Sequence, residues 1–205
     1  MAKERLKSPR GRLFVALDLP AEVREGLAAW QRRELADPAL RAVRAENLHI
    51  TLVFLGWQAE KDFERICGVA LGTAGAAPSG PPSPAPEVAL APEPIGRPPG
   101  RRPRLFALEA RSPGTEALQA QIEARLVAAR LHSAEKRPFW PHLTVARVKP
   151  ERRGSRKPAI VAERPGPLGG TPVRFRPTRL VVFRSHLHPS GARYEPMAEL
   201  ELPPA

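Results

Sequence analysis

Residues 47–56 read NLHITLVFLG, a run of β-branched and large apolar residues that ends at Gly56. This pattern predicts a mostly buried strand closed by a turn. A histidine and a threonine interrupt it at His49 and Thr51. Because side chains alternate between the two faces of a strand, both project from one face, whereas Ile50 packs on the other. One such pair alone is more typical of a half-buried histidine beside a good strand former.

The same pair recurs near the other end of the chain, in FWPHLTVARV, as His142 and Thr144. The segments before the two pairs are also alike, because LFVALDLP and LFALEARSP both read as strands and a helical pattern follows each. Phe14 lies 35 residues before His49, and Phe106 lies 36 residues before the second histidine. We infer a weak internal duplication in which each half reads strand, helix, strand.

Length and composition fit one compact unit, since 205 residues that are 42% hydrophobic can bury a sizeable core. The basic start MAKERLKSPRGR has no apolar segment after it, and no apolar run is long enough for a membrane span. We therefore expect a cytoplasmic protein without a membrane partner. The single cysteine, Cys67, excludes an intramolecular disulfide and a Cys-based zinc site, and its place in FERICGVAL predicts a buried structural thiol.

The chain is strongly basic, with 33 Lys and Arg against 21 Asp and Glu and a net charge of +12. Arginine supplies most of the excess, and its planar fork suits bidentate binding of phosphate. RNA or a nucleotide is the partner that this charge favours. The alternative is that a chain rich in Ala, Pro, Gly and Arg reflects a compositional bias, with much of the charge on solvated surface.

Strands and helices mix without a steady alternation, so we expect an α+β fold with antiparallel sheets. Residues 60–72 read as a further helix, and EVALAP, TPVRFRPTRLVVFRS and ARYEPMAELEL read as strands. The expected division of the single domain 1–205 is a first lobe at about 12–72, a Pro-rich connector at about 73–104 and a second lobe at about 105–202.

Two histidines on equivalent strands of a duplicated fold can face each other across a cleft. Imidazole titrates near neutrality, so one copy can act as a base and the other as an acid. This arrangement suits in-line phosphoryl transfer, with the threonine hydroxyls on non-bridging phosphate oxygens. Carboxylates that could bind magnesium are not clustered near either motif. We therefore expect a reaction that needs neither a metal ion nor another cofactor.

HITL at 49–52 and HLTV at 142–145, with the flanks RLFVALDLP, ENLHITLVFLG, LVVFRS and ARYEPMAEL, resemble the 2H phosphoesterase superfamily. The pattern is most similar to its RNA 2′,3′-cyclic phosphodiesterase branch, once called 2′-5′ RNA ligase, and spans roughly Arg12 to Leu200. The resemblance implies a bilobal, pseudo-twofold duplicated fold with antiparallel sheets lining a central cleft and helices outside. It also implies hydrolysis of RNA 2′,3′-cyclic phosphate ends to 2′-phosphomonoesters. We expect the protein to be a monomer.

The resemblance further implies a role for each motif residue. His49 would be the general acid that protonates the O3′ leaving group, and His142 the general base. The substrate would be held by four residues: Thr51 and Thr144 on the phosphate, Phe14 against the base or ribose, and Arg147 after the second motif. Arg147 stands at an odd offset from His142, so only a bulge or a strong twist can bring it to the same face of the strand.

The sequence leaves open the roles of the other histidines and the choice between several related functions. His132 follows a helix and suits its C-terminal end. His186 and His188 form HLH after a strand, which is either half of a metal site or a loop bordering the cleft. The alternative functions are 2′-5′ RNA ligation or opening of a small cyclic nucleotide at the same site, or a non-catalytic RNA-binding relative. Two complete motifs favour an enzyme, because binding alone needs no paired acid and base.

Overall fold

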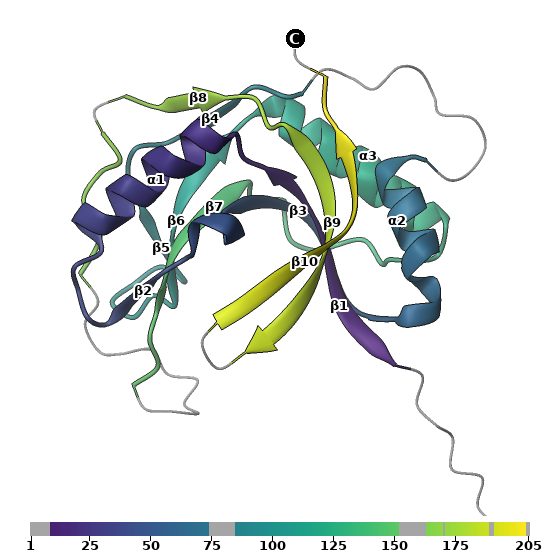
Figure 1. The fold of residues 1–205 in the computed structure, drawn as a ribbon, viewed down its shortest axis with the longest axis horizontal. Coiled ribbons are helices and arrows are strands. Elements are labelled where there is room, and N and C mark those ends of the chain that lie inside the picture. Colours follow the sequence, from purple (N-terminus) through teal and green to yellow (C-terminus); the bar gives the residue numbers. More distant parts are fainter. Residues whose placement is uncertain (1–8, 74–84, 152–162, 170, 189–190, 204–205) are drawn as a thin grey trace, which may run out of the picture.

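The computed structural model describes residues 9–73, 85–151, 163–169, 171–188 and 191–203. Within these residues, ten strands form one antiparallel sheet, and three α-helices pack on it (Figure 1). The strands are β1 (Arg10–Asp18), β2 (Leu40–Ala42), β3 (His49–Ala59), β4 (Val88–Leu90), β5 (Ile95–Arg97), β6 (Leu105–Arg111), β7 (His142–Val148), β8 (Val173–Phe175), β9 (Arg179–His188) and β10 (Gly191–Glu201). The helices are α1 (Ala21–Glu34), α2 (Phe63–Leu71) and α3 (Pro113–Ala128), with short 3-10 helices η1 (Ala45–Asn47) and η2 (Glu60–Asp62). The predicted α+β class with antiparallel strands is confirmed.

The sheet has two halves that meet at the motif strands. The β3 half has the order β10-β9-β1-β3, and the β7 half continues as β7-β6-β4-β8, with β2 on β7 and β5 on β6. The C-terminal hairpin β9-β10 pairs with β1, so it lies in the β3 half although sequence order would assign it to the second lobe. In the expected connector, β4 and β5 pair with β6, and residues 74–84 lie outside the described residues.

Each motif strand carries a β-bulge immediately after its threonine. In β3, Leu52 is the extra residue relative to β1, and in β7 Val145 is the extra residue relative to β6. A bulge places two residues of one strand opposite one residue of its partner, which shifts the alternation of the side chains that follow. Two bulges at the same motif position support the duplication inferred from sequence.

Strand register corrects one detail of the duplication. His49 pairs with Asp18, and His142 pairs with Glu109. Phe14 lies four residues before Asp18, and Leu105 lies four residues before Glu109. Leu105 is therefore the counterpart of Phe14, instead of Phe106, which the sequence spacing indicated. The difference arises because the segment that joins the two paired strands is longer in the second repeat: His49 lies 31 residues after Asp18, whereas His142 lies 33 residues after Glu109.

The core lies on the sheet face opposite the histidines. Ile50 and Leu143, which alternate with the motif residues, are fully buried in the same cluster as Trp30 of α1, Ile66 of α2 and Ile122 of α3. Helix α1 lies along the β7 half, whereas α2 and α3 lie beside the β3 half (Figure 1). Burying each of these side chains stabilises the fold by about 1.5–3 kcal/mol.

Cys67 of α2 is buried and free, as expected for a structural thiol. Burial raises the pKa of this thiol, which disfavours the reactive thiolate. None of the helices in the described ranges combines the length and the apolar character that a membrane crossing requires.

Candidate active site

A cavity of about 580 Å³ opens where the two halves of the sheet meet. All six residues singled out from the sequence line it: Phe14, His49, Thr51, His142, Thr144 and Arg147. Its remaining walls include Arg12, Arg41, Arg44, Asn47, Phe54, Leu105, His188 and Tyr194. Side chains that are far apart in the chain therefore surround a single space with arginine, histidine, hydroxyl and aromatic groups.

Both motif histidines are held by the same kind of hydrogen bond to a backbone carbonyl. Nδ1 of His49 lies 2.7 Å from the carbonyl oxygen of Asn47, and Nδ1 of His142 lies 2.7 Å from the carbonyl oxygen of Trp140. A carbonyl only accepts, so each Nδ1 carries the hydrogen and Nε2 of each neutral ring is the free base. Nε2 of His49 is 3.1 Å from the hydroxyl oxygen of Thr51, which donates to it.

The surroundings of the two rings differ. His142 stacks on Trp140, with ring centroids 4.0 Å apart and planes inclined by 11°. The guanidinium carbon of Arg97 lies 4.3 Å from the Trp140 ring on this stack. His49 instead meets Phe14 at 4.9 Å and the edge of Tyr194 at 5.2 Å between centroids. The positive charge of Arg97 therefore lies close to His142 across the Trp140 ring, whereas His49 is in contact with aromatic rings.

Both histidines are neutral at pH 7 in this site. Burial lowers the pKa of His49 to about 4; the hydrogen bond to Asn47 opposes that shift, and the charge of Arg147, together with that of His142 whenever it is protonated, adds to it. Burial also lowers the pKa of His142, and the charges of Arg97 and Arg147 lower it further. A neutral His142 suits a base. His49 can act as an acid only once an anion in the cavity raises its pKa.

Arg147 reaches the cavity because of the bulge at Val145. The extra residue returns Arg147 to the face that carries Thr144, as the odd offset required. The carbonyl of Val145 accepts hydrogen bonds from the backbone N–H of Val43 at 2.9 Å and the side chain of Gln31 at 2.8 Å. The residue that follows strand β2 and helix α1 thus hold the bulge that directs this arginine into the cavity.

Phe14, which the resemblance implied would lie against a base or ribose, lines the cavity but is largely covered by other rings. Its side chain is 3% exposed, packed with Phe183 at 5.3 Å and Tyr194 at 5.0 Å as well as with His49. Rings contributed by β9 and β10 cover it, so it supports the histidine and offers a substrate almost no surface. Phe54, which is 43% exposed, is the accessible aromatic residue on this wall.

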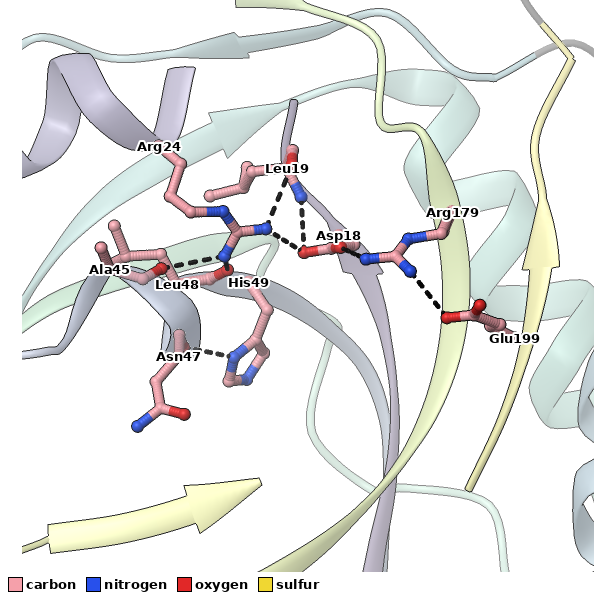
Figure 2. A network of polar contacts seen from close by, with 9 residues as sticks. All are labelled: Asp18, Leu19, Arg24, Ala45, Asn47, Leu48, His49, Arg179 and Glu199. Carbon is pink, nitrogen blue, oxygen red and sulfur yellow. Dashed lines mark hydrogen bonds and ion pairs between the residues drawn. The ribbon is translucent and has the colours of Figure 1, made fainter. Parts of the chain in front are cut away.

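A buried carboxylate network supports the segment before His49 (Figure 2). Asp18 is 6% exposed and pairs with both Arg24 and Arg179. Burial alone would raise the pKa of the Asp18 carboxyl, but hydrogen bonds from Arg179 and Arg24 outweigh it and hold that pKa below its usual value. Arg24 also donates to the carbonyl oxygen of Ala45 at 2.9 Å and thereby anchors η1.

The other histidines contribute less to the cavity. His186 lies in β9, where Nε2 is 2.7 Å from a carboxylate oxygen of Glu195, and it does not line the cavity. His188 ends the same strand and does line it. His132 lies just beyond α3, 3.5 Å from Glu123. Among the described residues, no group of three or more His, Cys, Asp or Glu side chains could hold a metal ion.

The sequence interpretation missed Phe54, although a signal for it exists. Phe54 stands three residues after Thr51, the same offset that separates Arg147 from Thr144. The two bulges return both positions to the cavity. Comparing the repeats beyond their HxT motifs would have identified it.

The chain is similar in sequence to several phosphodiesterases. Residues 17–79 match the family described as LigT like Phosphoesterase. The RNA 2′,3′-cyclic phosphodiesterase of Escherichia coli K12 is 34% identical over 137 residues, which cover 66% of this chain and 71% of that protein. The protein of the same name from Methanothermobacter thermautotrophicus is 31% identical over 195 residues, covering 93% of this chain and 98% of that protein.

Solved structures are similar to this chain in fold as well. The crystal structure of TT0787 of Thermus thermophilus has a TM-score of 0.70 at 26% identity, covering 93% of this chain and 97% of that one. Escherichia coli LigT complexed with NADP+ has a TM-score of 0.69 at 26% identity, covering 95% of this chain and 99% of that one. The complex of the same protein with 3′-AMP has a TM-score of 0.67.

Proposed function

Because the chain belongs to the LigT-like phosphoesterases of the 2H superfamily, we propose that it hydrolyses RNA 2′,3′-cyclic phosphate ends to 2′-phosphomonoesters without a metal ion. The names of its relatives and the arginine-rich cavity support this substrate class. We also propose that it works as a single-domain monomer, since the residues of one chain surround the cavity. A cytoplasmic location remains our expectation from the sequence.

One observation carries the proposal, namely that two imidazoles are presented to one cavity in the same tautomer. Each Nδ1 donates to the carbonyl two residues earlier, which leaves Nε2 of His49 and of His142 for proton transfer. A hydrolysis that needs one proton removed and one supplied requires such a pair. Binding without reaction does not.

The reaction then proceeds in line. A water oxygen bonds to phosphorus while its proton passes to Nε2 of His142. The bond between phosphorus and O3′ breaks, and Nε2 of protonated His49 gives its proton to O3′. Thr51 and Thr144 donate to the non-bridging oxygens, and Arg147 offsets the charge of the transition state. The products are a 2′-phosphomonoester and a 3′ hydroxyl, and exchange with solvent resets the two rings.

The substrate phosphate itself prepares His49 for the acid role. With a pKa of about 4, His49 is unprotonated near neutrality before substrate arrives. A phosphate anion placed beside the ring favours the imidazolium and raises that pKa. We therefore assign the acid role to the substrate complex, with His142 kept neutral by burial and by neighbouring arginines.

The decisive experiment supplies cyclic-ended oligonucleotides and 2′,3′-cyclic mononucleotides in EDTA and identifies the product by phosphorus NMR. We expect 2′-phosphomonoester to form at an undiminished rate. His49→Ala and His142→Ala should each lower turnover by about 10² to 10⁴. His186→Ala is the matched control, because that histidine does not line the cavity.

Three outcomes would contradict the proposal. Loss of activity in EDTA with recovery on adding a divalent ion would refute the metal-free reaction. Near wild-type turnover in His49→Ala would make the first motif structural. Joining of a 2′,3′-cyclic phosphate end to a 5′-hydroxyl end, with the P–O3′ bond broken and no phosphomonoester released, would instead establish the alternative 2′-5′ ligase.

A further inference from the structure

We propose that Arg41 of β2 binds the phosphodiester that joins the terminal nucleotide of the RNA to the nucleotide before it, and that this contact favours chain ends over mononucleotides. The inference rests on the proposed function and extends it from the cyclic phosphate to the chain behind it. Because the cyclic phosphate closes the 3′ end, the rest of the RNA continues from the 5′ oxygen of the same ribose. A second phosphate therefore follows the first out of the cavity.

Arg41 lies directly opposite Arg147 on neighbouring antiparallel strands. Both side chains line the cavity, and the Cβ atoms of such a pair are about 4.5–5.5 Å apart. Like charges in this position repel each other and destabilise the sheet. No carboxylate among the described residues forms an ion pair with either arginine. An anionic ligand in the cavity would supply the negative charge that this pair lacks.

The two arginines serve different parts of the cavity. Arg147 lies near the reacting groups, because its charge lowers the pKa of both His49 and His142. Arg41 is exposed and reaches instead toward the hairpin β9-β10. A methyl group built on Gly191 would lie 3.8 Å from the guanidinium carbon and from Nη1 of Arg41. One cation is therefore placed for the cyclic phosphate, and the other is placed for a phosphate at the rim.

The other two arginines of the cavity wall have partners within the fold. Nε of Arg44 is 3.2 Å from a carboxylate oxygen of Glu46, and the guanidinium carbon of Arg12 lies 5.1 Å from the centroid of the Phe54 ring. Arg41 makes neither kind of contact with the described residues. An arginine fork can hold a phosphate by two parallel hydrogen bonds. Arg41 therefore has its donors available for a second phosphate.

The test compares three substrates with the same cyclic end. They are uridine 2′,3′-cyclic phosphate, the dinucleotide ApU with that cyclic end, and the same dinucleotide with a neutral methylphosphonate in place of its internal diester. Wild-type protein should show the lowest KM for the charged dinucleotide. Arg41→Gln should raise this KM by about 3- to 10-fold, as expected for one charged hydrogen bond at a solvated rim. It should leave the other two KM values unchanged.

Two further readouts identify the contact as one of charge. Arg41→Lys, which keeps the positive charge, should preserve the order of the three KM values. The slope of log KM against log salt concentration for the charged dinucleotide should become shallower by about 0.7 in Arg41→Gln, which is the share of one phosphate contact with a single strand.

Arg33→Gln is the matched control. Arg33 is exposed in the last turn of α1 and does not line the cavity, so this variant removes the same charge and should change none of the three KM values. Equal increases for all three substrates in Arg41→Gln would overturn the inference, because a residue that only supports the hairpin or binds the cyclic phosphate affects them alike. An unchanged KM for the charged dinucleotide would also overturn it.

A binding measurement separates this inference from the proposed function. Calorimetry with ApU that ends in a 2′-phosphate, and with its methylphosphonate analogue, needs no turnover. If the wild-type protein hydrolysed none of the cyclic substrates, the proposed function would fail. Weaker binding of the charged ligand alone in Arg41→Gln would then still support the phosphodiester contact, and equal binding of that ligand by variant and wild type would refute it.

Discussion

Ile50 and Leu143 form the backbone pair that joins β3 to β7 in the described part of the chain. Each is the middle residue of an HxT motif, and each is fully buried. Because side chains alternate, the histidines and threonines on either side face the cavity. Because β3 and β7 are antiparallel, continuing this register by one residue places His49 opposite Thr144. The contact that joins the two halves also aligns the groups proposed to react.

The first prediction concerns this contact. Leu143→Ala should lower the free energy of unfolding by about 2–5 kcal/mol, because it leaves a cavity between β3 and β7. Urea unfolding followed by circular dichroism measures the change. Val127→Ala, at a half-exposed position of α3, is the control and should stay within about 0.5 kcal/mol of wild type. A loss under about 1 kcal/mol in Leu143→Ala, below the usual range for such a change, would show that the halves are held together elsewhere.

The stack behind His142 leads to the second prediction. Arg97→Met removes a positive charge that lowers the pKa of His142, so that pKa should rise. The acid limb of the rate profile should move to higher pH, and proton NMR of the free protein should show the same displacement for His142. Arg101→Met, in the exposed loop after β5, should leave both measurements unchanged. An unmoved titration in Arg97→Met would mean that the charge acting across Trp140 is negligible.

The depressed pKa of His49 predicts how acid affects stability. The unfolded chain takes up this proton at higher pH than the folded chain, because the folded pKa is about 4 and the ordinary value is 6.5. The contribution of neutral His49 to the free energy of unfolding is therefore fully present above about pH 6.5. It is lost as the pH falls toward 4, and the total loss is about 3 kcal/mol.

Replacing the group tests that prediction. Urea unfolding of wild type and His49→Gln at pH 7 and pH 4 should show a smaller loss for the variant, which has no proton to take up. His186→Gln, at an exposed position paired with Glu195, should lose as much stability as wild type. Identical losses for His49→Gln and wild type would place the acid-sensitive group elsewhere.

Local pattern was enough to predict the motif strands. Alternation along His49 and Thr51, repeated at His142 and Thr144, is a property of neighbours in the chain, so the shared cavity face could be read directly. The requirement of a bulge for Arg147 followed from the same period of two, and the structure contains that bulge.

Contacts between distant segments could not be predicted in this way. The burial of Phe14 depends on Phe183 and Tyr194, which the C-terminal hairpin brings beside β1. Sequence order suggested a hairpin in the second lobe, because strand pairing between segments so far apart in the chain leaves no periodic signal. The ion pair of Asp18 with Arg179 has the same origin.

The last prediction concerns Arg24, which joins the buried carboxylate of Asp18 to the carbonyl of Ala45 (Figure 2). The next turn of backbone contains Asn47, whose carbonyl fixes Nδ1 of His49. Arg24 does not line the cavity, so it acts as a positioning residue through η1. Removing it frees the backbone that sets the orientation of the imidazole.

Arg24→Leu should therefore lower kcat by about 10- to 100-fold with a much smaller change in KM, since misplacement of a reacting group by about 1 Å costs about that much. Arg179→Leu is the matched control, because it also takes one partner from Asp18 but leaves the bond to Ala45 intact. Both variants should lose stability, by at least about 1.5–3 kcal/mol for the charged hydrogen bond to Asp18 that each removes. Only Arg24→Leu should slow turnover, and proton NMR should show the His49 Nδ1–H exchanging faster in that variant alone. Equal kcat values in the two variants would mean that the network stabilises the fold without orienting His49.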